Sequence, residues 1–503
     1  MKILGKQFIS FVSRVLAMFL GIFQSLLIVN ILSVSEYGII GLVTAIAGIA
    51  GITQHLGLAA SSTKEISQAK SGNEILNVVL ASLSIRLLIS VPVSLFLIFG
   101  AYYISDLYKN ADLIFPLQAF GFVTLIQAFQ SIMNSVISGT QRFKLLFTYQ
   151  VLIAVLSLVI YVPLVINFKL DGYFYSIVIF NLAQTILLTY LAFRGQDIRF
   201  HLPTFKEIFQ ISKTLLKISL IVYLVKILFT AWQEVPIVYL SKYYSLEMIA
   251  LFTFAFNLAS KLMTVSDSVT DVNLPVYSKE SQENYTQFLS DFKENFLVMY
   301  FIILFIGISI SFWGIEILKF VDVLMYGVGI VSGLNLSRDI YIRFSPSLVF
   351  FTPLIISIIF YSFINILKSS IFVPLEKLKS LLIMYVSLIF VTFLTFMFLE
   401  SFQKDMVNMA IALGFGAFGS FLYALFYLRS ALGIYLLKIK DFLFTFFSMV
   451  LIICINYIFN LDLPQKMIVY GVYILSIKFI FKLGYLDLIF GKFYNKFVRL
   501  FKI

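Results

Sequence analysis

The segment SEYGIIGLVTAIAGIAGITQHLGLAASSTKEIS, residues 35–67, decides the fold class of this chain. It has an acidic residue, Glu36, near its start, an apolar stretch over about 39–60, and a polar end. About 20 apolar residues in a helix cross the hydrocarbon core of a bilayer. Transmembrane strands need only about 9–11 residues and alternate in polarity, so the length of this stretch predicts a membrane-spanning helix.

The same pattern recurs along the whole chain. Of its 503 residues, 61% are hydrophobic and only 12% are charged, and the mean hydropathy is +0.99. A soluble domain carries about 25% charged residues, so this composition predicts a protein dissolved in lipid. We expect fourteen membrane-spanning helices, at approximately 8–32, 39–60, 76–100, 113–137, 145–166, 172–193, 218–240, 247–271, 295–318, 346–367, 380–399, 406–428, 442–459 and 467–483.

Lysine and arginine are distributed unequally between the two sides of the predicted membrane. Of 37 such residues, 24 fall in the termini and loops on one side, 8 in loops on the other, and 5 inside spans. Cytoplasmic loops carry an excess of basic residues, so we expect both termini to be cytoplasmic. The net charge of +12 then orients the chain and contacts anionic lipid, and it does not indicate a nucleic-acid partner.

Residue types that the sequence lacks exclude several kinds of chemistry. Cys454 is the only cysteine, which excludes a disulfide framework and a cysteine-based metal site. His55 and His201 are the only histidines, so a histidine-rich metal site is not expected. The sequence has no G-x-x-x-x-G-K-[ST] loop, and we therefore expect no ATPase activity, no other enzymatic function and no cofactor.

A weak internal repeat organises the chain. The segment LEMIALFTFAFNLASKLMTVSDSVTDVNLPVYS, residues 246–278, aligns with residues 35–67 when it is shifted by 211 positions, which places Glu247 on Glu36. Six spans separate the copies, so both have the same orientation. We expect an all-α polytopic membrane protein with two parallel six-helix lobes and a C-terminal helix pair. Many transporters with repeats bind substrate near the bilayer midplane, between the lobes.

The expected domain boundaries follow from these spans. They give an N-terminal lobe at 1–193, a cytoplasmic amphipathic connector at 194–217, a C-terminal lobe at 218–435, a terminal transmembrane helix pair at 436–484 and a basic amphipathic tail at 485–503. In the connector, Lys206, Lys213 and Lys217 recur at helical spacing with apolar residues between them. This pattern is typical of a helix that lies in the headgroup layer.

Ionisable residues inside spans are candidates for function. Each costs at least about 2.5–3.5 kcal/mol at the centre of an isolated helix, so it needs a partner or a wet cavity. Arg14 and Arg86 lie in the first and third spans, and Lys226 and Glu234 share the seventh. The two arginines could instead bind helix-end carbonyls, and the two residues of the seventh span could simply neutralise nearby charges.

The eighth span carries the strongest polar signal. Seven polar residues fall within about 120° of arc if the helix is continuous: Asn257, Ser260, Lys261, Thr264, Asp267, Ser268 and Asp271. This number exceeds what helix packing requires, and we expect the stripe to line a cavity. In the second span, by contrast, Thr44, Gly48 and Gly51 form a narrow face that favours close helix packing.

Five segments together point to a family. They are LSVSEYGIIGLVTAIAGI (32–49), HLGLAASSTKEIS (55–67), ISGTQRFKLL (137–146), DVNLPVYSKE (271–280) and LMYGVGIVSGLNLS (324–337). With Arg14 in the first span, their order and spacing resemble the bacterial polysaccharide flippases that move O-antigen-like units. These flippases belong to the multidrug/oligosaccharidyl-lipid/polysaccharide exporter superfamily. The resemblance covers spans 1–12.

The resemblance implies a fold, a location and partners. It implies twelve core helices in two lobes that work by alternating access in the bacterial cytoplasmic membrane. The substrate would be an undecaprenyl-diphosphate-linked oligosaccharide, passed to the outer leaflet for polysaccharide biosynthesis. The expected partners are this lipid-linked oligosaccharide and membrane lipids, with a polysaccharide polymerase and other assembly proteins as further candidates.

The charges inside the spans favour one function within this superfamily. A cation exporter needs an acidic cavity and a lipid diphosphate needs a basic one, and the spans hold more basic than acidic residues. Because Arg and Lys bind phosphate directly, we expect the diphosphate to be held by Arg14, Lys226 and Lys261. We expect sugars to contact Gln24, Asn257 and Thr264, and ion movement to be coupled by Asp267 or Glu234. The alternative is a cation-coupled multidrug antiporter on the same fold.

Overall fold

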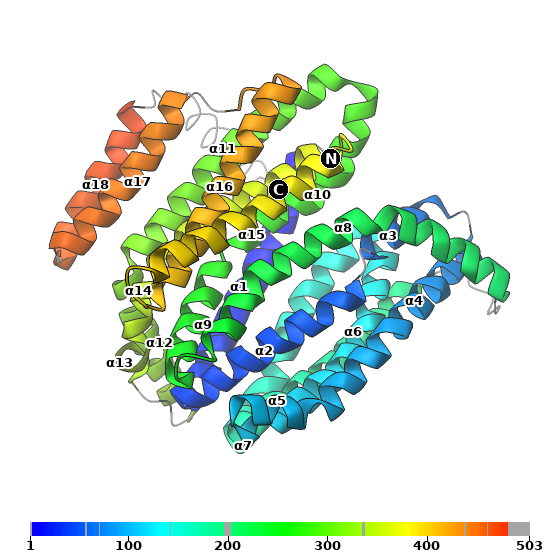
Figure 1. The fold of residues 1–503 in the computed structure, drawn as a ribbon, viewed down its shortest axis with the longest axis horizontal. Coiled ribbons are helices and arrows are strands. Elements are labelled where there is room, and N and C mark those ends of the chain that lie inside the picture. Colours follow the sequence, from blue (N-terminus) through cyan, green and yellow to red (C-terminus); the bar gives the residue numbers. More distant parts are fainter. Residues whose placement is uncertain are drawn as a thin grey trace.

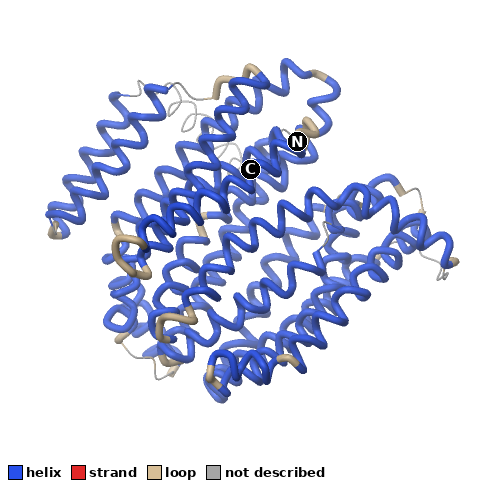
Figure 2. The backbone as a smooth tube through the Cα atoms, in the orientation of Figure 1, coloured by secondary structure: helices blue, strands red, loops and turns tan. Residues whose placement is uncertain are grey.

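The computed structural model describes the backbone of residues 3–55, 58–69, 71–140, 142–195, 203–333, 336, 338–436, 439–459 and 461–480. Within these ranges the chain is helical and contains no strand (Figure 2). Nine of the described helices are long and apolar enough to cross a membrane. Each of the fourteen predicted spans overlaps a described helix, and the prediction of an all-α multi-pass protein is confirmed. The predicted tail at 485–503 lies outside the described residues.

Two groups of helices form two lobes (Figure 1). The N-terminal lobe contains α1 (Ile3–Ile31), α2 (Val34–His55), α3 (Leu58–Gln68), α4 (Gly72–Phe99), α5 (Ala101–Tyr108), η1 (Ala111–Leu113), α6 (Ile114–Gly139) and α7 (Phe143–Phe193). The C-terminal lobe contains α8 (Phe205–Leu240), α9 (Leu246–Ser260), α10 (Met263–Glu283), α11 (Tyr285–Phe312), α12 (Gly314–Ser332), α13 (Ile340–Phe344), η2 (Ser345–Ser347), α14 (Leu348–Leu367), η3 (Lys368–Phe372), α15 (Leu378–Glu400) and α16 (Val407–Leu432). A terminal pair, α17 (Ile439–Phe459) and α18 (Leu463–Ile480), packs against α11.

Helix α7 contains two of the predicted spans. The backbone leaves helical geometry at Lys169, where φ is 49°. Beyond this residue the chain folds back on itself. The ring centroids of Tyr161, before Lys169, and of Phe180, after it, therefore lie only 5.8 Å apart. The two ends of α7 are joined by Arg142, whose guanidinium donates to the carbonyls of residues 191, 192 and 194. Burial lowers the pKa of this guanidinium below its ordinary value.

Residues 205–217 of the expected connector and the seventh span form one continuous helix, α8. Its N-terminus has a capping box, in which Thr204 accepts from the backbone N–H of Glu207 and the Glu207 carboxylate accepts from the backbone N–H of Thr204. Ile208, Ile211 and Leu215 pack with α3 and α4. The apolar face of this amphipathic segment therefore contacts protein.

The segment at about 319–345, which joins the ninth and tenth predicted spans, is largely helical, and its sequence did not indicate this. Helix α12 covers most of it, and Leu318, Asp322 and Met325 form its buried face. Asp322 accepts a 2.9 Å hydrogen bond from the backbone N–H of Ile340, the first residue of α13. One buried carboxylate thus connects the two helices of this segment.

Candidate functional site

The two lobes meet where α2 packs against α8 and α9, and where α1 packs against α10. We call the end of the bundle that holds the α1–α2 and α8–α9 turns the outer end, following the predicted topology. Here α2 and α9 approach closely because α2 has glycines at the contact. A Cβ added to Gly38 would lie 2.1 Å from the Leu246 carbonyl oxygen, and one added to Gly41 would lie 2.5 Å from Thr253 Oγ1. Larger residues would hold the lobes apart at this seam.

A second contact closes the outer end. The guanidinium of Arg343, on α13, donates to the carbonyl oxygens of Leu32 at 2.8 Å and of Val29 and Asn30 at 3.2 Å. These carbonyls end α1, so a cation is well placed there. The same guanidinium forms a 3.1 Å salt bridge with Asp339. The C-terminal lobe is thereby fastened to the first helix of the N-terminal lobe.

Four charged side chains form a cluster between the helices of the C-terminal lobe. Lys226 and Glu234 lie on α8, Asp267 lies on α10 and Lys368 begins η3, and all four are half-buried. The ammonium group of Lys226 interacts electrostatically with the other three. We call these four residues the charge cluster. It brings together three of the predicted site residues and adds a second lysine.

Neighbouring groups hold the charge cluster in place. Asn365 Nδ2, on α14, donates a 2.9 Å hydrogen bond to Asp267 Oδ1. The Lys226 ammonium lies 5.0 Å from the centroid of the Phe229 ring, within range of a cation–π interaction. This ring stacks on Tyr361 at 4.7 Å, and Trp232 stacks on the same tyrosine at 5.2 Å. The cluster is therefore bordered by an aromatic stack.

Glu234 also reaches the other lobe. A Cβ added to Gly48, on α2, would lie 3.3 Å from Glu234 Oε1. The glycine face expected to serve close packing thus packs against an ionisable residue of the opposite lobe. Binding of a proton or a cation to Glu234 would change the charge of this carboxylate directly at the contact between α2 and α8.

The eighth span is divided. Helix α9 ends at Ser260 and α10 begins at Met263, and between them the backbone makes hydrogen bonds to the third preceding residue, as in Leu262 N–H to Ala259 O at 3.0 Å. Such tightening rotates the residues that follow, because a 3₁₀ turn has 3.0 residues and an α turn 3.6. Lys261 lies at this junction and Thr264 just after it, both half-buried. The side chain of Asp271 lies outside the described residues.

Other predicted site residues lie apart from the charge cluster. Gln24 Oε1 accepts a 2.6 Å hydrogen bond from Ser157 and so joins α1 to α7 within one lobe. Asn257 Nδ2 donates to the Tyr37 hydroxyl at 3.2 Å, across the α2–α9 seam. Arg14 lies on α1, but its side chain is outside the described residues.

Sequence reasoning missed Lys368, Asn365 and Arg343. The tenth predicted span ends at residue 367, whereas η3 continues the helical path of α14 through Lys368 as a π-helix. Such turns are frequent at functional sites. Asn365, as a polar residue inside the apolar stretch FINIL, could have been noticed. No signal in the sequence connects Arg343 with the end of α1.

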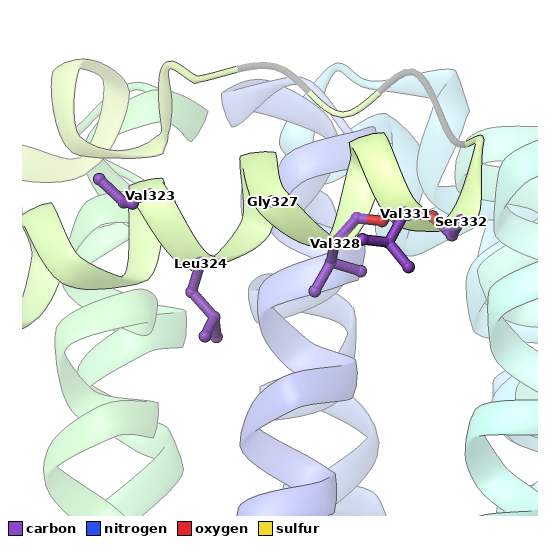
Figure 3. Close-up of a pocket in the computed structure, with 6 residues that line it drawn as sticks. All are labelled: Val323, Leu324, Gly327, Val328, Val331 and Ser332. Atoms are coloured by element: carbon purple, nitrogen blue, oxygen red, sulfur yellow. Dashed lines mark hydrogen bonds between the residues drawn. The ribbon is translucent and has the colours of Figure 1, made fainter.

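A hollow of about 480 Å³ lies elsewhere, beside α12. Its lining residues are Val323, Leu324, Gly327, Val328, Val331 and Ser332, and Figure 3 shows Leu324 and Val328 pointing to the same side of the helix. It contains no residue of the charge cluster. In the part of the chain that the structure describes, no group of three or more His, Cys, Asp or Glu side chains could hold a metal ion.

Comparison with known proteins identifies a family and structures with a similar fold. The family model of polysaccharide biosynthesis proteins matches residues 27–322, and no curated protein matches the chain. The lipid II flippase MurJ, in an inward closed conformation, is 12% identical with a TM-score of 0.68, and the match covers 97% of this chain and 100% of that one. Such an identity establishes the fold alone.

Two structures of multidrug resistance MATE family transporters of the MOP superfamily are also similar. The inward-facing one is 14% identical with a TM-score of 0.65, covering 86% of this chain and 98% of that one. The outward-facing one is 14% identical with a TM-score of 0.54, and the match covers 85% of this chain and 95% of that one. The fold of this chain is therefore that of the MOP superfamily transporters.

Proposed function

This chain belongs to the polysaccharide biosynthesis protein family, and we propose that it is a flippase for an undecaprenyl-diphosphate-linked oligosaccharide. It would pass this lipid from the cytoplasmic to the outer leaflet of the bacterial cytoplasmic membrane by alternating access, with both termini in the cytoplasm. The observation that carries the proposal is the pair of lysines, Lys226 and Lys368, placed within electrostatic range of each other among membrane-spanning helices.

Two ammonium groups repel each other, and the repulsion is stronger in a low-dielectric interior than in water. Glu234 and Asp267 balance the formal charge of the two lysines, so a diphosphate would bind there together with protons or cations that neutralise these carboxylates. Phosphate oxygens accept charge-assisted hydrogen bonds from lysine, which acts as a point charge. Arg14 and Lys261 remain proposed ligands of the same diphosphate.

The remaining predicted residues keep their proposed roles. Gln24, Asn257 and Thr264 would contact the sugars. Asp267 or Glu234 would couple ion movement. For Glu234 the proposal gains support from the contact with Gly48, because a change of charge there acts on the packing of the two lobes.

The conformation fits one stage of alternating access. The outer end is closed by the glycine seam and by Arg343. We infer that this structure corresponds to an inward-facing stage, in which a substrate enters from the cytoplasmic leaflet.

The test is flipping of a labelled lipid-linked oligosaccharide in proteoliposomes by the wild-type protein and by Lys226→Ala, Lys368→Ala and the double variant. A charge-assisted hydrogen bond contributes about 1.5–3 kcal/mol, so each single variant should raise the half-saturating substrate concentration by about 10–100-fold. Lys242→Ala removes an exposed lysine from the α8–α9 turn and should behave as wild type.

Unchanged flipping by the double variant would refute the role of the lysine pair. A further variant combining Arg14→Ala, Lys226→Ala and Lys261→Ala tests the wider set of basic residues. The multidrug antiporter alternative predicts a different result. In that case the wild-type protein would exchange a cationic dye for sodium or protons in the same vesicles and would not flip the lipid-linked oligosaccharide.

A further inference from the structure

Helix α4 carries a buried polar face inside the N-terminal lobe. Ser82, Arg86, Ser90 and Ser94 recur at four-residue spacing, so they lie on one side of the helix. All four are buried, and Arg86 is only 1% exposed. It is the fifteenth of the 28 residues of α4, which places its charge near the middle of a membrane-spanning helix.

The guanidinium of Arg86 lacks the partners that a buried charge requires. Its Nε and Nη2 atoms have no hydrogen-bond partner, and no salt bridge to it occurs among the described residues. The one acidic residue of α4, Glu74, is twelve positions earlier, about 18 Å along the helix. An isolated ionised group in such an interior is strongly unfavourable, and buried charges in proteins are paired or bound to ions.

The helices around Arg86 supply apolar groups and hydroxyls. Helix α4 packs against α2, α3, α6 and α8. One turn before Arg86, the hydroxyls of Ser82 and Ser62 lie 2.7 Å apart. Beside this turn, Leu58, Ala81 and Leu215 form a small apolar cluster. The named serines and apolar residues offer hydrogen-bond donors and a dry surrounding and carry no charge. The carboxylates on these helices, Glu36, Glu65, Glu207 and Glu234, form no salt bridge with Arg86 among the described residues.

We propose that Arg86 binds a small inorganic anion, such as chloride, inside the N-terminal lobe. The size of the ligand follows from the burial, because a side chain that is 1% exposed cannot reach a diphosphate carried by a lipid. A monatomic anion would accept hydrogen bonds from the guanidinium, with the Ser82 hydroxyl one turn away as a further donor. The site stabilises the lobe and is separate from the charge cluster of the C-terminal lobe.

The test is the thermal unfolding of the full-length protein, purified in detergent in sodium gluconate, as chloride replaces gluconate at constant ionic strength. A ligand that binds the folded state raises the Tm in a saturable manner. We expect a rise of about 1–3 °C for the wild-type protein, and a similar rise with bromide. Arg86→Gln should abolish the rise, and Arg86→Lys should shift its midpoint to higher chloride.

Arg194→Gln is the matched control, because it removes an exposed arginine from the end of α7 and should leave the chloride response intact. The proposal fails if the wild-type Tm is the same in chloride and gluconate, since water alone would then solvate the guanidinium. It also fails if Arg86→Gln keeps the wild-type response. If Arg86→Gln does not fold, Arg86→Lys and Ser82→Ala decide, and an unchanged chloride midpoint in both overturns the site.

Discussion

Arg343 joins the two lobes through a single side chain. Its guanidinium contacts three carbonyls at the end of α1, which otherwise lack intrahelical donors. Arg343→Ala should therefore weaken the outer closure by about 1.5–3 kcal/mol and raise the outer-open population by about tenfold or more. The measurement is the rate of disulfide formation between cysteines placed at Gly41 and Thr253 across the seam, after Cys454→Ser; the rate should fall.

The control for this residue is Arg429→Ala. Arg429 lies 5.3 Å from the Tyr435 ring, as Arg343 lies 5.8 Å from the Phe344 ring, but it is at the other end of the bundle. It should not change the disulfide rate. An equal rate in Arg343→Ala and its parent would mean that the glycine seam alone keeps the outer end closed.

At the scale of the element, the seam between α2 and α9 depends on the absence of side chains. Gly38→Ala would place a methyl group 2.1 Å from a backbone oxygen, which cannot move aside as a flexible side chain can. Overpacking of this kind costs about 1–3 kcal/mol, so we expect a lower Tm and a more open outer end. Gly21→Ala, in α1, meets no atom within 4 Å and should be neutral or stabilising by up to about 1 kcal/mol. Comparing the two Tm values checks the prediction, which is wrong if both variants match the wild type.

The elements could be predicted from the sequence to different degrees. Spans were predictable because the bilayer fixes the length of an apolar helix, and even the hairpin at Lys169 lies between two predicted spans. Helix α12 was missed because it crosses a segment with charged residues, and its Asp322 is satisfied by a backbone N–H far along the chain. The proximity of Lys226 to Lys368 depends on how α8 packs in the C-terminal lobe, and the helical periodicity of the sequence does not predict this packing.

Across the whole molecule, the contacts between lobes follow the internal repeat. The shift of 211 residues places α2 on the eighth span, and α1 on the seventh by the same order. Exchanging the two repeats converts the contact of α1 with α10 into the contact of α8 with α2. The same exchange converts the contact of α2 with α9 into itself. This is the pattern of an approximate two-fold axis between two lobes. An axis through the α2–α9 seam makes it the natural place for the lobes to separate.

If the lobes move as rigid bodies, a covalent bond across the seam should stop transport and a bond within one lobe should not. A Cβ at position 41 would lie 3.0 Å from Thr253 Cβ, about half an ångström below the disulfide range, so α2 and α9 must separate slightly for Gly41→Cys and Thr253→Cys to cross-link. Ser311→Cys with Thr352→Cys, whose hydroxyls lie 2.9 Å apart on α11 and α14, gives a cross-link inside the C-terminal lobe. In a Cys454→Ser background, oxidation should abolish lipid flipping by the first pair, reduction should restore it, and the second pair should flip in both states. Full flipping by the oxidised first pair would show that the outer end does not open between α2 and α9.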